Sequence, residues 1–244
     1  MNKILAGFLL FFYVFPVCAF TVNRERIDGA LSFYQQENYD EAVKAYEIMI
    51  LDGLKNPYIF YNLSNAYYKT GNIGKASVNI EKALRLAPRD KDIRYNRELL
   101  AKSAKEPDPN IAEFIAQEIK LLVSLNEITA ITGIFFIGLA VCFGLYCLKK
   151  EKIFLKYSIV FLILFVSAGM LLYVKFNDEF ITKEAIVLND TYVRNKPIKT
   201  EEIAFEVFAG RKVVILSELG KWVNIKLLLD GFSGWIDKNS LEKI

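Results

Sequence analysis

PYIFYNLSNAYYKTGNIGKASVNIEKALRLAPRD, residues 57–90, is the stretch that decides the fold. Two small residues, Ser64 and Ala76, stand where a pair of antiparallel helices would cross, and close packing admits only small side chains there. Gly71 marks the turn between the helices, and Pro88 ends the second helix. The stretch therefore predicts one closely packed helix–turn–helix unit. The space beside the crossing is filled by Phe60, Leu63, Tyr67, Ile80 and Ala83.

The preceding period of 34 residues, 23–56, carries a weaker copy of the same pattern. It keeps Ala42 at the crossing and aromatic residues at Phe33 and Tyr46. A terminal repeat with one face open to water is expected to match less well. The copy departs from the pattern at Arg26, Gly29 and Leu54.

A third helix start follows in KDIRYNRELLAKSAK, residues 91–105, before Pro107 and Pro109 end any helical pattern. We interpret residues 91–105 as a cap helix that ends the array and turns a polar side to solvent. Two units plus a cap give five helices, which is short for an array that usually needs about three repeats or more. We therefore expect this domain, residues 20–106, to be stabilised by packing against another surface.

The unit at 57–90 resembles a tetratricopeptide (TPR) repeat, and 23–56 resembles a degenerate one. TPR units bind other proteins, so the resemblance implies a protein-binding role, with first-helix residues lining a concave groove. Tyrosine suits such a groove because it offers broad apolar area, one hydroxyl and little rotamer entropy to lose. The alternative is that several of these tyrosines serve packing or face solvent. The candidate partner-binding residues in the groove are Tyr34, Tyr58, Tyr61, Asn62, Asn65, Tyr68 and Tyr95.

Composition argues against catalysis and against nucleic-acid binding. The 244 residues contain no His, and Cys142 and Cys147 lie in an apolar segment, so we expect no enzyme activity, no cofactor and no metal. The net charge is +3, but its excess lies at the N-terminal tip and in one short loop. The two flanking domains carry equal numbers of basic and acidic residues, whereas a nucleic-acid binder would show a basic face on a folded domain.

The first 19 residues read as a secretory signal peptide. Lys3 gives the positive start, residues 4–15 form the apolar run, and Ala19 precedes the expected cleavage site. The alternative is an uncleaved membrane anchor, although the run is short for a span of about 17–25 residues.

Two long uncharged segments, residues 128–148 and 157–174, predict a transmembrane hairpin over 128–174. The loop between them, residues 149–152, reads KKEK, and its lysines favour the cytoplasmic side. Both flanking domains would then lie outside the cytoplasm. The alternative is a pair of core helices in a soluble protein, which would still show a polar face.

The segment before the hairpin, residues 107–127, is predicted to be an amphipathic linker. Its apolar residues repeat with helical spacing, so the segment would lie on the bilayer surface or cap the helical core. The sequence leaves both placements open. The apolar stripe consists of Ile111, Ile115, Ile119, Leu122 and Leu125.

Residues 182–244 change to short β-branched runs divided by turn residues, and they predict a small closed barrel. The expected strands lie at 185–188, 192–194, 203–208, 212–216, 222–228 and 234–236. The pattern resembles a bacterial SH3-like domain through VRNKP, GKW and DGFSGWI. Trp222 and Trp235 are candidate partner-binding residues here, against the alternative that at least one of them is core.

The order of these parts resembles the BatE family of bacterial aerotolerance proteins. The stretches LRLAPRDKDIRYN (84–96) and KWVNIKLLLDGFSGWI (221–236) are the most similar. The resemblance implies a non-enzymatic scaffold of the bacterial inner membrane, with two spans and periplasmic TPR and SH3-like domains. It implies membrane-anchored von Willebrand factor A proteins, other TPR proteins and a MoxR-type AAA+ ATPase as partners. The alternative function is a peptidoglycan-binding envelope protein that recruits a cell-wall enzyme.

Overall fold

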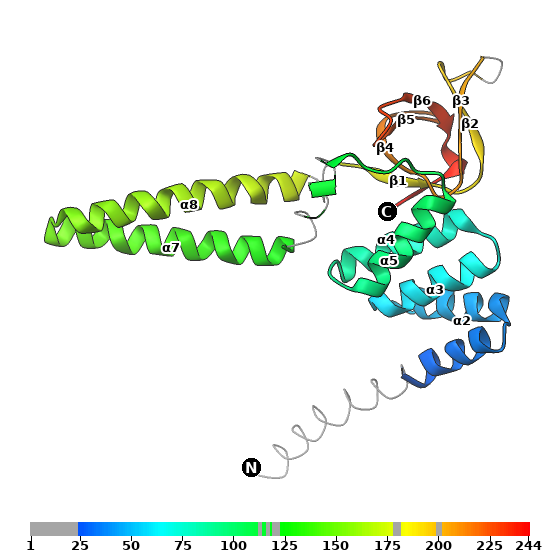
Figure 1. Ribbon diagram of the computed structural model, residues 1–244, viewed down its shortest axis with the longest axis horizontal. Helices are drawn as coiled ribbons and strands as arrows, with labels where there is room; N and C mark the ends of the chain where they lie inside the picture. Colours follow the sequence, from blue (N-terminus) through cyan, green and yellow to red (C-terminus); the bar gives the residue numbers. More distant parts are fainter. Residues whose placement is uncertain (1–23, 112–113, 116–117, 119–122, 178–181, 199–201) are drawn as a thin grey trace, which may run out of the picture.

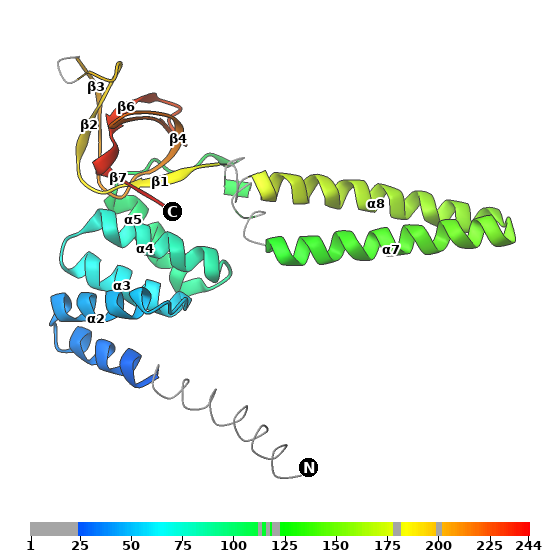
Figure 2. The same cartoon turned by 180° about the vertical axis from the view of Figure 1, so that it is seen from behind.

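The computed structural model describes residues 24–111, 114–115, 118, 123–177, 182–198 and 202–244 (Figure 1). They form an array of stacked helices, a pair of long apolar helices and an antiparallel sheet. The array and the sheet lie side by side, and the long helices project away from both (Figures 1 and 2). The predicted signal peptide and parts of the predicted linker lie outside the described residues.

The array begins with a helix over residues 24–35 and continues with α2 (Tyr39–Leu51), α3 (Pro57–Lys69), α4 (Ile73–Leu86) and α5 (Lys91–Ser103). Side-chain caps define three of the helix starts, because they satisfy backbone N–H groups that have no partner inside the helix. Asn56 accepts from the N–H of Tyr58, Asn72 from that of Lys75, and Asp90 from those of Asp92 and Ile93.

The crossing of α3 and α4 confirms the helix–turn–helix prediction. Ser64 and Ala76 are fully buried, and the Ser64 hydroxyl donates to the Ala76 carbonyl at 2.7 Å. The same core extends through α2 and reaches α5 at Ile93 and Leu100. One continuous apolar cluster therefore holds the array together, as a stacked repeat requires.

The long helices are α7 (Leu125–Lys149) and α8 (Lys152–Phe176), and they run antiparallel along their whole length. Each has 25 residues and spans roughly 37 Å at 1.5 Å per residue, which is enough to cross a bilayer. Only 11% and 6% of their most apolar windows are buried, whereas core helices of a soluble protein would be mostly buried. The helices are closely packed at Gly138, where a Cβ would come within 2.5 Å of the Phe161 ring.

The C-terminal strands are β1 (Glu184–Val187), β2 (Thr191–Arg194), β3 (Ile203–Val207), β4 (Lys212–Leu219), β5 (Trp222–Leu227), β6 (Ser233–Asp237) and β7 (Leu241–Lys243). They form one antiparallel sheet in the order β3-β2-β6-β5-β4-β1-β7. All six predicted strands are present, and β7 is an additional strand that the sequence pattern did not predict.

The predicted closed barrel is wrong, because the sheet is open. Among the strands described, β3 pairs with β2 and β7 pairs with β1, and no pairing joins β3 to β7. The cause is visible at β2, which meets β6 at a single residue pair, Arg194 and Trp235, and then leaves the sheet with β3 as a projecting hairpin (Figure 1).

Candidate protein-binding surfaces

One side of α3 faces away from the core of the array. Its opposite side, from Ile59 to Tyr67, supplies the buried core positions. Tyr58 and Tyr68 are 56% and 47% exposed, and the residues between them on the same side are partly exposed. We call this side, with the residues that join it from neighbouring helices, the tyrosine face. Its predicted members on α3 are Tyr58, Tyr61, Asn62, Asn65 and Tyr68.

Tyr34, from the helix 24–35, joins the tyrosine face. Its ring packs edge-on against Tyr39, with ring centroids 5.2 Å apart and an angle of 67°. The pKa of Tyr34 is raised, first by burial and then by the nearby hydroxyls of Tyr39 and Tyr61. Tyr34 and Tyr61 are therefore brought together as predicted, and Tyr39 is an additional member that the repeat pattern did not indicate.

Tyr46 lies directly beneath this part of the face. Its side chain is fully buried, and among the described residues its hydroxyl makes no hydrogen bond of normal geometry. Burial raises the pKa of Tyr46, and the amide of Asn62 lies close enough to offset part of that increase. Asn62 therefore stands between the core of the array and the surface a partner would meet.

Asn65 links α3 to α5. The side-chain amide of Asn96 donates to Oδ1 of Asn65 at 2.8 Å. Because that oxygen is occupied, Asn65 would offer its NH₂ group to a partner. Asn96 was missed by the sequence reading, since it lies in a segment interpreted as a solvating cap.

The remaining predicted tyrosines occupy the ends of the face. The Tyr58 hydroxyl donates to Oδ2 of Asp90 at 3.2 Å, and this bond raises the pKa of Tyr58. Tyr95 is 61% exposed on α5, and Tyr68 stands at the far end of α3. An open hollow of about 520 Å³ adjoins that end and is lined by Glu37, Asn38, Tyr39, Asp40, Glu41, Lys69 and Thr70.

The two tryptophans lie on one face of the C-terminal sheet. Trp222 and Trp235 alternate with the core residues Val223 and Ile236, so both indoles are on the side turned away from the sheet core. Trp222 is only 8% exposed, whereas Trp235 is partly exposed. The fold brings the two residues to one surface but leaves only Trp235 accessible to a partner.

A second surface, which the sequence reading did not locate, joins the array to the C-terminal sheet. The outer side of α4 contacts β1 and the residue after it so closely that a Cβ on Gly74 would stand 2.1 Å from the Leu188 carbonyl oxygen. A Cβ on Gly210 would stand 2.7 Å from the Ser77 hydroxyl. These two glycines allow the contact, and we call it the docking interface.

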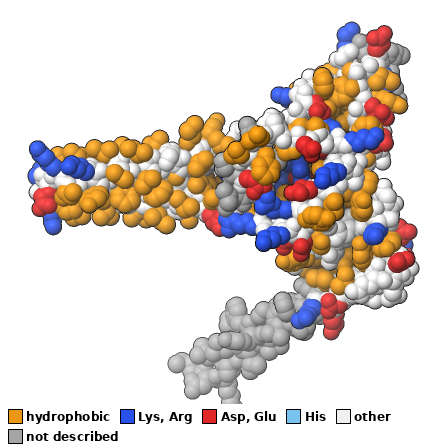
Figure 3. Space-filling model, in the orientation of Figure 1, with side chains coloured by type: hydrophobic (Ala, Val, Ile, Leu, Met, Phe, Trp, Pro, Cys, Tyr) orange, Lys and Arg blue, Asp and Glu red, His pale blue; other side chains and the backbone are white. Residues whose placement is uncertain are grey.

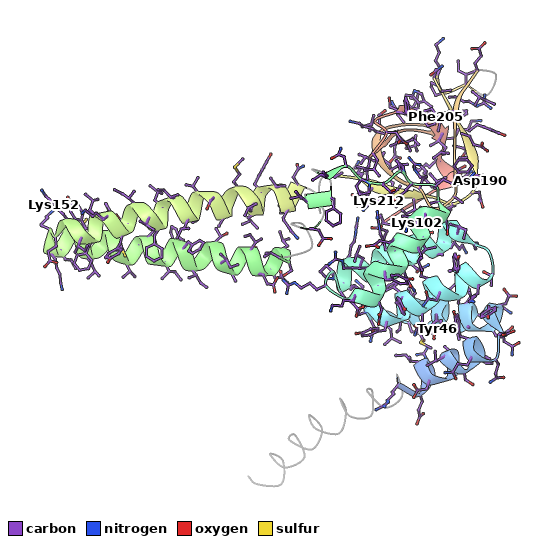
Figure 4. The ribbon with its side chains drawn as sticks, viewed as in Figure 1. Tyr46, Lys102, Lys152, Asp190, Phe205 and Lys212 are labelled. Carbon is purple, nitrogen blue, oxygen red and sulfur yellow. The ribbon has the colours of Figure 1, made fainter. Side chains whose placement is uncertain are left out.

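Glu81 lies at the centre of the docking interface, with only 8% of its side chain exposed. Arg97 and Lys212 each bond to it at 3.1 Å, and Lys212 also reaches Glu184 at 3.0 Å. Burial raises the pKa of Glu81, but the charges and hydrogen bonds of Lys212 and Arg97 outweigh burial and lower it to about 2. Figure 4 labels Lys212 where the sheet meets the helices.

Further polar contacts surround this centre. The Arg211 guanidinium donates to the Lys105 carbonyl at 2.6 Å and also bonds to Asp230. The N–H of Lys212 donates to Glu106 at 3.1 Å. At the rim, Lys82 pairs with Glu242 at 2.8 Å and Arg85 with Glu184 at 3.0 Å.

Residues 57–90 match the tetratricopeptide repeat family. No curated protein matches the chain. The match coincides with α3 and α4, the helices that carry most of the tyrosine face and one side of the docking interface. The chain therefore contains a TPR repeat, and TPR repeats are typical of non-enzymatic modules for protein–protein interaction.

Proposed function

We propose that this protein is a non-enzymatic scaffold of a bacterial inner-membrane complex that binds partner proteins through the tyrosine face. The observation that carries the proposal is the row of polar and aromatic side chains on the first helix of a TPR repeat: Tyr58 and Tyr68 are exposed, and Tyr61, Asn62 and Asn65 are partly exposed. Exposed aromatic rings and amides beside a rigid core suit an extended peptide, because they bind apolar groups and backbone amides with little loss of entropy.

The apolar hairpin supports membrane anchoring. Figure 3 shows hydrophobic side chains along its length and charged side chains at its far end, where Lys149, Lys150 and Lys152 lie. A lysine-rich loop favours the cytoplasmic side, so the array and the sheet would both lie in the periplasm. Labelling intact cells with a membrane-impermeant maleimide tests this in a background without native cysteines: Tyr192→Cys should react and Glu151→Cys should not. The reverse pattern would overturn the orientation.

The resemblance to the BatE family supplies candidate partners. They are membrane-anchored von Willebrand factor A proteins, other TPR proteins and a MoxR-type AAA+ ATPase, in a system for aerotolerance and oxidative-stress tolerance. The test is in-cell crosslinking of the tagged protein, solubilisation and mass spectrometry of the captured proteins. Capture of wall-synthesis enzymes in their place would count against this complex.

The Asn65–Asn96 hydrogen bond provides a test variant and a matched control for this capture experiment. Tyr61→Ala combined with Asn65→Ala should abolish capture and leave the helical circular dichroism unchanged. Asn96→Ala loses the same amide bond but keeps Asn65, so it should retain capture. Equal loss in both variants would mean that the bond between α3 and α5 matters, and not the tyrosine face.

Partial exposure of Trp235 favours a second candidate, binding of peptidoglycan by the C-terminal sheet. Sedimentation of the detergent-solubilised protein with purified cell wall tests it, with Trp235→Ala as the variant and Tyr192→Ala as an exposed aromatic control on the same sheet. Sedimentation that Trp235→Ala alone reduces would support wall binding, and absence of sedimentation would exclude it.

A further inference from the structure

The outer side of α4 differs from that of α2, although the two helices are the second helices of successive repeat units. Positions one period apart include Glu47 and Glu81, whose side chains are 44% and 8% exposed. They also include Ile48 and Lys82, and Leu51 and Arg85. Ile48 and Leu51 are 53% and 84% exposed on α2, whereas Lys82 and Arg85 are paired with acidic residues of the sheet.

We propose that the C-terminal sheet is the cap of the TPR array, and that array and sheet form one body into which the apolar hairpin is inserted. Stacked repeats bury their core only against neighbours, and short arrays need terminal capping. In this chain, α5 covers one side of α4, and the sheet covers the outer side at Gly74, Ser77 and Glu81.

The chemistry of the docking interface fits a permanent contact. Both cations that reach Glu81 have a second acidic partner, Glu106 for Arg97 and Glu184 for Lys212. Buried charges paired in this way are hardly screened by salt. Separation would break the Lys212–Glu81 pair, which joins the sheet to the array, although Glu81 would keep Arg97 and Lys212 would keep Glu184. The contact is also closely packed, because backbone atoms of Leu188 stand against Gly74.

The cap has a consequence for the chain between the two parts. Residues 107–183 connect array and sheet and contain the hairpin, so both ends of the hairpin return to the same body. Arg89 pairs with Glu127 at 2.5 Å, which also ties the α4–α5 turn to the start of α7. The cap proposal does not depend on the proposed partner, since it concerns contacts within one chain.

The test cuts the full-length protein and asks whether its parts stay together. A protease recognition sequence is inserted between Asn177 and Lys183, and an affinity tag is added after Ile244. After cleavage in mild detergent, the tagged sheet should capture the array with its hairpin. Separation of the two wild-type fragments after cleavage would overturn the proposal.

Two variants from opposite sides of the docking interface make the test specific. Gly74→Leu drives a side chain into the Leu188 carbonyl, and Lys212→Met removes the cation shared by Glu81 and Glu184. Each should lower co-capture at least about tenfold, since the first variant forces packed backbone apart and the second removes the buried ion pair that joins sheet and array. Gly29→Leu is the matched control, because a Cβ there meets nothing within 4 Å, and it should capture like wild type. Undiminished co-capture in both interface variants would contradict the proposal.

Discussion

The two sides of the TPR repeat at 57–90 have opposite chemistry. The tyrosine face on α3 carries neutral hydroxyl and amide groups and is open to solvent. The outer side of α4 carries charged groups and is covered by the C-terminal sheet. In this repeat, the charged groups lie where the sheet supplies their partners, and the neutral polar groups lie where none of the other described residues covers the surface. One repeat can thus serve a contact within the chain and leave its other side to a second protein.

The largest expected effect is on the free energy of unfolding, which a substitution at the docking interface should lower more than one on the tyrosine face. Glu81→Ala should lower the free energy of unfolding by about 3 kcal/mol or more, because it removes the carboxylate that Lys212 and Arg97 share and leaves each with one acidic partner, Glu184 or Glu106. Tyr61→Ala should lower it less, since the Tyr61 ring is only partly buried against the core of the array. Chemical denaturation followed by circular dichroism measures both. Similar losses for the two variants would erase the distinction between the sides.

The second largest effect is the loss of stability at the docking interface when the pH is lowered. Glu81 has a pKa of about 2 in the fold, against 4.5 when unperturbed. Its lowered pKa contributes stability above pH 4.5, which is lost as the pH falls towards 2; the full difference amounts to about 3 kcal/mol.

Denaturation midpoints between about pH 6 and pH 2 check this contribution. Wild type should lose more stability than Glu81→Gln over that interval, because the other carboxylates titrate in both proteins. Parallel curves for the two proteins would show that Glu81 does not carry the pH dependence.

A smaller effect concerns the close contact between α4 and β1. Gly74→Ala should cost about 1–3 kcal/mol, because its Cβ overlaps the Leu188 carbonyl and the sheet must move. Gly29→Ala should instead stabilise the helix 24–35 by about 0.5–1 kcal/mol, since its Cβ has open space. Thermal melting of the two variants should move in opposite directions, and a neutral Gly74→Ala would show that the docking interface yields easily.

The smallest effect on stability is expected at the ends of the tyrosine face. Tyr68→Ala and Tyr95→Ala should change the free energy of unfolding by less than about 0.5 kcal/mol, because both side chains are largely exposed. Partner capture, measured by crosslinking, should nevertheless fall. If capture is unchanged in both variants, the partner occupies only the central part of the face around Tyr61.

Much of the array followed from local pattern. The residues of 57–90 predicted α3, α4 and their crossing, because they resemble the TPR signature, in which small residues lie where the two helices cross. The exposed side of α3 also followed, since helical spacing places Tyr58, Tyr61 and Asn65 together. The bond from Asn65 to Asn96 did not, because α5 carries its polar residues in a pattern that solvent exposure explains equally well.

The C-terminal sheet shows which features the local sequence pattern could not predict. Period-two alternation located six strands, but it did not decide whether the sheet closes, because closure depends on register and on the direction in which β2 and β3 leave β6. The two tryptophans were correctly assigned to strands, but the sequence left open which of them would be buried, and the structure buries Trp222 on the outer face.

By itself, the sequence determined the repeat, the apolar helices and most of the strands, since these depend on residue spacing within short segments. The tertiary structure alone decided that Glu81 on α4 meets Lys212 on β4, 131 residues away in sequence. Such a contact depends on how two folded surfaces fit. Glycines such as Gly74 and Gly210, and charged residues such as Glu81 and Lys212, are common in any sequence. That they form an interface can be seen only once the array and the sheet are placed together.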